Sequence, residues 1–79
     1  MKIKLLYFAS LADRAGRSAE TRDTSANTPQ DLYAEVAREH AFEFSPAHVR
    51  VAVNGALAGW DRPLADGDEV VFLPPVSGG

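Results

Sequence analysis

The chain has 79 residues, a formal net charge of −3 and no cysteine. A chain this short forms one domain with a thin core, and the lack of cysteine excludes disulfides, thiolate metal ligands and a cysteine nucleophile. The basic residues are scattered and no apolar stretch approaches the roughly 18 residues that span a membrane, so we expect a cytoplasmic protein that binds neither nucleic acid nor membrane. With only two histidines and no evident ligand set, we expect no metal and no bound cofactor.

The first third of the chain predicts two strands and a short helix. Residues 2–8 open with apolar and lysine side chains in alternation, which favours a strand. A helix is expected over residues 10–15, with Ser10 as its N-cap and Gly16 following its last turn. Residues 17–24 are polar but lack glycine and proline, and they predict an edge strand.

The strongest local signal begins a longer helix. Thr28 suits the N-cap, Pro29 the first helical position, and Asp31 completes a capping-box pattern. Side chains for one buried face then recur at helical spacing: Leu32, Tyr33, Val36 and His40. The helix should end before Pro46, and Glu35, Arg38 and Glu39 are expected on its solvated side.

The remaining chain predicts three strands, over residues 49–53, 56–58 and 69–73. Asn54-Gly55 indicates a two-residue hairpin turn between the first two. The order of elements predicts an α+β fold of the β-grasp (ubiquitin-like) type, a mixed sheet packed on one main helix. We expect the domain to occupy residues 1–73 and a flexible tail to occupy residues 74–79.

The first strand predicts a second apolar surface besides the core. Ile3, Leu5 and Tyr7 share one face, whereas Leu6 and Phe8 share the other. The last strand repeats the pattern with Val71 and Leu73. Both faces cannot be core in a two-layer domain, so the outer face should be a partner surface near the tail.

The chain ends in Ser77-Gly78-Gly79, which adds little that could pack. One interpretation is a frayed terminus of small residues. The functional interpretation is a carboxylate on a thin stalk, because residues without Cβ can thread a narrow channel in a partner. A carboxylate is a poor electrophile and no motif for activating it is present, so a partner enzyme would have to activate it.

Residues 64–79, L-A-D-G-D-E-V-V-F-L-P-P-V-S-G-G, closely resemble the end of the small subunit of molybdopterin synthase, the MoaD family. Residues 7–16 resemble that family's first strand and turn, and residues 51–55 its central strand. The double proline followed by a Gly-Gly end, after D-G-D-E-V, is the specific part of the motif.

The resemblance implies a sulfur carrier that acts as a non-catalytic subunit, with the active site chiefly on the large subunit. An E1-like adenylyltransferase would consume ATP to adenylate Gly79, and a sulfurtransferase would supply sulfur to make a thiocarboxylate. The tail, with Gly78 and Ser77, would thread into the large subunit of molybdopterin synthase within a heterotetramer. Sulfur would pass there to a cyclic pyranopterin precursor in molybdenum cofactor biosynthesis. The resemblance assigns four residues to docking: Phe8, Leu73, Pro74 and Pro75.

Three alternatives stay open on the sequence. The related carrier for thiamin thiazole synthesis shares the fold and the Gly-Gly end, but it is usually shorter and lacks the double proline. A ubiquitin-like modifier would use the same activated Gly79 and differ only in its acceptor, a lysine of a target protein. A passive interaction module would have no use for the tail.

Overall fold

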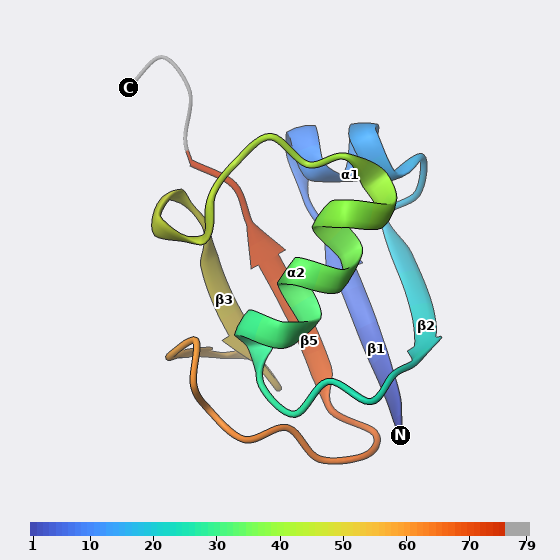
Figure 1. Ribbon diagram of the computed structural model, residues 1–79, viewed down its shortest axis with the longest axis vertical. Coiled ribbons are helices and arrows are strands. Elements are labelled where there is room, and N and C mark those ends of the chain that lie inside the picture. Colours follow the sequence, from blue (N-terminus) through green and yellow to red (C-terminus); the bar gives the residue numbers. More distant parts are fainter. Residues whose placement is uncertain (76–79) are drawn as a thin grey trace.

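The computed structural model describes residues 1–75. Its elements, in chain order, are β1 (Lys2–Tyr7), α1 (Ala9–Ala15), β2 (Ala19–Asp23), α2 (Pro29–His40), the 3-10 turn η1 (Pro46–His48), β3 (Arg50–Val53), β4 (Ala56–Ala58) and β5 (Glu69–Leu73). The strands form one sheet in the order β2-β1-β5-β3-β4, with α2 lying across one face (Figure 1). β1 and β5 run parallel and the other neighbours antiparallel, which confirms the predicted β-grasp architecture.

The core lies between α2 and the sheet. From α2, Leu32, Tyr33 and Val36 are buried, as their helical spacing predicts. The sheet supplies alternate residues of its three central strands: Ile3, Leu5, Tyr7, Val51, Val53, Val70 and Phe72. Full burial of one such apolar side chain contributes about 1.5–3 kcal/mol, so this single layer of contacts carries most of the stability.

The predicted ends of α2 are confirmed. The Thr28 Oγ1 accepts a hydrogen bond of 3.2 Å from the Asp31 backbone N–H, and Pro29 opens the helix. Ala41 ends it in the left-handed region with φ 57°. Asn54 and Gly55 also have positive φ, 53° and 85°, which is what the predicted two-residue hairpin turn requires.

Five predicted boundaries are wrong by one or two residues, including both ends of the edge strand, because β2 spans Ala19–Asp23 rather than 17–24. β1 ends at Tyr7 because the next residue, Phe8, is the N-cap of α1, so Ser10 is not the cap. The chain turns sharply at Ala9, whose φ of 51° interrupts the extended backbone. Val49 is the C-cap of η1, and β3 begins only at Arg50.

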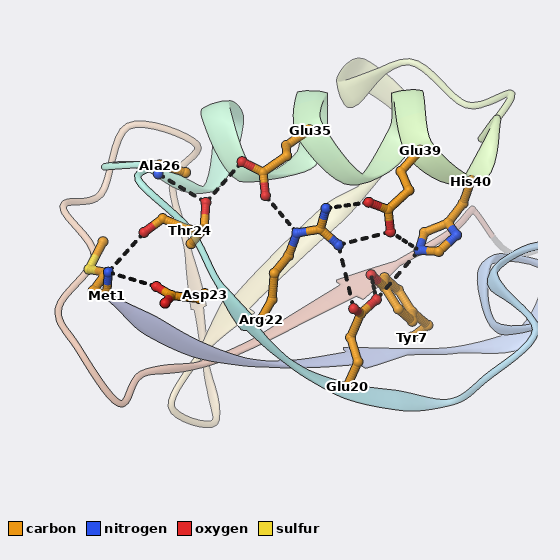
Figure 2. A network of polar contacts seen from close by, with 10 residues as sticks. All are labelled: Met1, Tyr7, Glu20, Arg22, Asp23, Thr24, Ala26, Glu35, Glu39 and His40. Carbon is orange, nitrogen blue, oxygen red and sulfur yellow. Dashed lines mark hydrogen bonds and ion pairs between the residues drawn. The ribbon is translucent and has the colours of Figure 1, made fainter.

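A polar cluster joins the edge strand β2 to α2 (Figure 2). The Arg22 guanidinium donates to Glu35 and Glu39 of α2, each at 2.6 Å. Its Nη1 also lies 3.4 Å from Oε1 of Glu20. The Tyr7 hydroxyl donates to the other oxygen of Glu20 at 2.6 Å, and His40 Nε2 lies 3.4 Å from that oxygen. The edge strand is therefore held to the helix by charge-assisted hydrogen bonds.

We predict that the Arg22 contacts make stability depend on pH in the acid range. The Arg22 hydrogen bond holds the pKa of Glu39 below its ordinary value. A carboxyl with a lowered folded-state pKa stabilises the protein above its unfolded pKa of about 4.3, and this contribution disappears as the pH falls. Arg22→Met should lower the free energy of unfolding by about 1–3 kcal/mol at neutral pH, because the half-buried Glu20 loses its cation. The variant should also lose less stability than the parent as the pH falls.

Thermal melts followed by circular dichroism between pH 3 and pH 7 would test this expectation. The control is Arg38→Met on the exposed side of α2, since no ion pair of Arg38 occurs within residues 1–75. Equal melting temperatures for the two variants at neutral pH would show that the Arg22 contacts contribute nothing.

Candidate functional site

The sheet face opposite α2 carries a row of apolar side chains. Strand register places Leu6 beside Val71, and Val71 beside Ala52. Ala19 and Leu57 extend the row to the two edge strands. Neighbours in register share a face, so these five residues form the apolar row. The Leu57 side chain is 66% exposed, and the three central side chains are half-buried.

A groove adjoins one end of the apolar row, where β5 leads into the tail. Because Tyr7 pairs with Phe72 in the parallel ladder, the next residues, Phe8 and Leu73, lie at the same end of the sheet. The Phe8 side chain is 51% exposed. We call this hollow the tail-root groove, and it is lined by Phe8, Ala9, Ser10, Phe44, Ala47, His48, Val49, Arg50, Leu73, Pro74 and Pro75.

All four residues assigned to docking line the tail-root groove: Phe8, Leu73, Pro74 and Pro75. The groove also contains residues that sequence reasoning missed, above all Phe44 and Val49. Phe44 lies outside regular structure and is held by its backbone carbonyl, which accepts a 2.7 Å hydrogen bond from the Tyr33 hydroxyl. Leu57 was missed as well, although its place in the short strand that follows the hairpin turn could have indicated an exposed edge position.

The ionisable residues that line the tail-root groove are both basic, His48 and Arg50. The other end of the same face is polar, with Lys4 Nζ 3.9 Å from a Glu69 carboxylate oxygen. The outer face therefore changes from polar at the start of β1 to apolar beside the tail. The three predicted tail residues, Ser77, Gly78 and Gly79, lie outside the described residues.

The polar cluster around Arg22 is suited to structure rather than to acid–base catalysis. Burial and the hydrogen bond to Glu20 raise the pKa of Tyr7, so its hydroxyl stays protonated at neutral pH. Every buried side-chain nitrogen and oxygen within residues 1–75 has a hydrogen-bond partner.

Two other kinds of feature are absent from the described part of the chain. Residues 1–75 contain no group of three or more side chains suited to hold a metal ion. No helix in the described part of the chain is long and apolar enough to cross a membrane.

The arrangement offers an apolar face and groove, bounded by polar residues, at the point where the chain leaves the sheet. Such a surface is typical of a protein–protein contact. The tail begins inside this surface, since Pro74 and Pro75 line the groove. A protein bound there would be in contact with the start of the tail.

Comparison with known proteins assigns the family. The molybdopterin synthase sulfur carrier subunit of Escherichia coli strain K12 is 36% identical over 80 residues, covering 98% of this chain and 99% of its own. Small archaeal modifier protein 1 of Haloferax volcanii superposes with a TM-score of 0.78 at 27% identity, covering 95% of this chain and 98% of that one.

A third relative was solved as a complex of subunits 1 and 2 of the molybdopterin-converting factor from Helicobacter pylori, with a TM-score of 0.68, 25% identity and full coverage of both chains. The model of the ThiS family matches residues 5–79. These similarities confirm the resemblance indicated by the C-terminal motif. The chain belongs to the ThiS family.

Proposed function

We propose that this protein is the sulfur carrier and small subunit of molybdopterin synthase. The observation that carries the proposal is the tail-root groove, a largely apolar hollow at the point where the chain leaves the sheet toward its Gly-Gly end. The name of the Escherichia coli relative and the two-subunit complex from Helicobacter pylori support it. In this proposal the large subunit covers the groove and the apolar row, and it receives the tail.

The chemistry that we propose takes place at the Gly79 carboxylate. The carboxylate attacks the α-phosphorus of ATP on an E1-like enzyme, which forms an acyl adenylate and releases pyrophosphate. A hydrosulfide equivalent supplied by a sulfurtransferase attacks the acyl carbon and displaces AMP, which leaves a thiocarboxylate. On the large subunit, the thiocarboxylate sulfur attacks a carbon of a cyclic pyranopterin precursor and displaces an oxygen substituent. Water then hydrolyses the resulting thioester, which leaves the sulfur on the pterin and restores the Gly79 carboxylate. The role of this chain is to dock and to place one carbonyl group.

We predict that Phe8→Asp abolishes binding to the large subunit and leaves the fold intact. Phe8 is 51% exposed, so the substitution removes little from the core. Phe8 is also the N-cap of α1, a position that favours aspartate. In the complex, however, the new carboxylate would be buried in an apolar contact, which should raise Kd by about a hundredfold or more.

Isothermal titration calorimetry with the large subunit measures this effect, and circular dichroism checks the fold. Ala34→Asp places the same carboxylate on an exposed position of α2, on the opposite side of the sheet, and should bind normally. If Phe8→Asp binds as tightly as Ala34→Asp, Phe8 is not part of the interface.

We also predict that the position of the terminal carboxylate decides activity. Deleting Gly79 would leave a glycine at the end, but about 3.3 Å short of the catalytic groups of the partner. Misplacement on that scale can cost about a hundredfold in rate. Adding one residue would convert the Gly79 carboxylate into an unreactive amide. Gly78→Val should also fail, since a β-branched side chain widens the stalk.

The assay for these variants is ATP-dependent adenylation, followed by sulfur transfer to the pterin precursor. Their melting temperatures should match that of the parent, because the changes leave the sequence of residues 1–75 intact. The parental chain with its native end is the control for turnover. Sulfur transfer at the parental rate by the chain that lacks Gly79 would overturn the carrier function.

The likeness to small archaeal modifier protein 1 supports a second candidate, a ubiquitin-like protein modifier. The match to the ThiS family keeps the thiamin carrier as an alternative as well. Intact-mass spectrometry of the protein from its own cells separates a carrier from a modifier. A thiocarboxylate, which is heavier than the carboxylate by the difference between sulfur and oxygen, supports a carrier. A ladder of isopeptide-linked products supports a modifier.

A further inference from the structure

The tail-root groove has a charge character opposite to that of the whole protein. The chain carries 11 acidic residues and a net charge of −3, yet none of the acidic residues lines the groove. Its ionisable residues are His48 and Arg50. Arg50 is charged at every physiological pH, whereas a histidine charge depends on the pH. Arg50 therefore gives the groove a permanent positive charge.

Strand register places Arg50 inside the docking surface. It is the first residue of β3 and pairs with Leu73 of β5, so both side chains lie on the outer face. Arg50 is exposed, and Leu73 belongs to the same groove. A partner that covers Leu73 must therefore also cover the guanidinium or meet it at the rim.

Arg50 forms no ion pair with any of residues 1–75, in contrast to three other arginines of the chain. Arg14 binds Glu43 at 2.9 Å, Arg22 binds Glu39 at 2.6 Å, and Arg62 Nη1 lies 3.6 Å from Asp68. A guanidinium presents its donors in a planar fork that fits both oxygens of a carboxylate. If a partner covered the guanidinium with apolar surface alone, the charge would lose its hydration and gain no hydrogen bond in exchange.

We propose that Arg50 is a specificity-determining residue, which selects a large subunit that presents a carboxylate to the tail-root groove. The proposal rests on the proposed function, because it names the chemistry of that same partner. The carboxylate lies opposite β3, where it accepts a forked pair of hydrogen bonds from Arg50. Apolar contacts with Phe8 and Leu73 supply the bulk of the contact, and the ion pair sets the register and rejects partners without the acid.

The charges also argue against a second copy of this chain as the occupant. A twofold dimer through the groove would bring the same basic lining residues, Arg50 and His48, into the interface from both copies. Within residues 1–75, no acidic side chain lines the groove to offset these positive charges. The groove therefore fits a partner of complementary charge better than it fits itself.

The experiment titrates the large subunit with the parent and four variants, Arg50→Glu, Arg50→Lys, Arg38→Glu and Phe8→Asp. Arg38 is an exposed arginine of α2, on the other side of the sheet, and provides the matched charge reversal. We expect Arg50→Glu to weaken binding by at least about tenfold and Arg38→Glu to change it by less than about twofold. Arg50→Lys keeps the charge but cannot form the forked pair of hydrogen bonds, so its affinity should fall between those of the parent and Arg50→Glu. Circular dichroism checks that each variant is folded.

A charge swap makes the test specific. Each acidic residue on the docking side of the large subunit is changed in turn to arginine, and one such variant should restore binding to Arg50→Glu while weakening binding to the parent. The proposal is overturned if Arg50→Glu binds within about twofold of the parent, the effect expected of an unpartnered exposed charge. It is overturned equally if Arg50→Lys loses as much affinity as Arg50→Glu, or if no acidic residue of the partner yields the swap.

Two further outcomes distinguish failure of the proposed function from failure of the role proposed for Arg50. If the parent does not bind the large subunit at all, the proposed function fails, whatever Arg50 does. If the parent and Arg50→Glu both bind the large subunit and Phe8→Asp does not, the proposed function stands and only the role of Arg50 fails. Analytical ultracentrifugation of the chain alone completes the test, because a dimer that Arg50→Glu disrupts would assign the groove to a second copy and overturn the proposal.

Discussion

The parallel pairing of β1 with β5 is the constraint on which the rest of the molecule depends. It places the beginning and the end of the domain side by side in the middle of the sheet, with Tyr7 opposite Phe72. Two parallel neighbours cannot be joined by a tight turn, so the intervening chain must cross over, and it carries α2 across one face (Figure 1). The same pairing puts Phe8 next to Leu73 and builds the tail-root groove from both ends of the chain.

One helix can cover only one face of a five-stranded sheet, so the other face is not covered by α2 and its character varies along the strands. Near the start of β1 that face is polar, with Lys4 paired to Glu69, as on an ordinary solvated sheet. Towards the tail it becomes the apolar row and the tail-root groove. Exposed apolar surface stabilises the free protein little, and in the proposed function it is the surface to which the large subunit binds. Docking at this place would position the terminal group without any catalytic side chain from this chain.

The edge strand β2 is attached to the domain by polar contacts, because it is too polar to join the core by apolar contacts. Its inward-facing residues, Glu20 and Arg22, are the centre of the polar cluster with α2 (Figure 2). Sequence periodicity placed Glu35 and Glu39 on the solvated side of α2, whereas both bind Arg22. Helical spacing shows which residues share a face, but it does not show that a strand from elsewhere in the chain supplies a cation to that face.

Local signals were sufficient for much of the fold. The Thr28 cap, the alternation in β1 and the Asn54-Gly55 turn act within a few residues, so their effects were predictable, and the C-terminal motif indicated the family before any geometry was known. The composition of the tail-root groove was not predictable in the same way. Phe44, Val49 and Arg50 join Phe8 there only because strand register and the turn after α2 bring distant segments together. Side-chain contacts across the sheet depend on which strands pair and in which register, and that is decided by the packing of the whole domain.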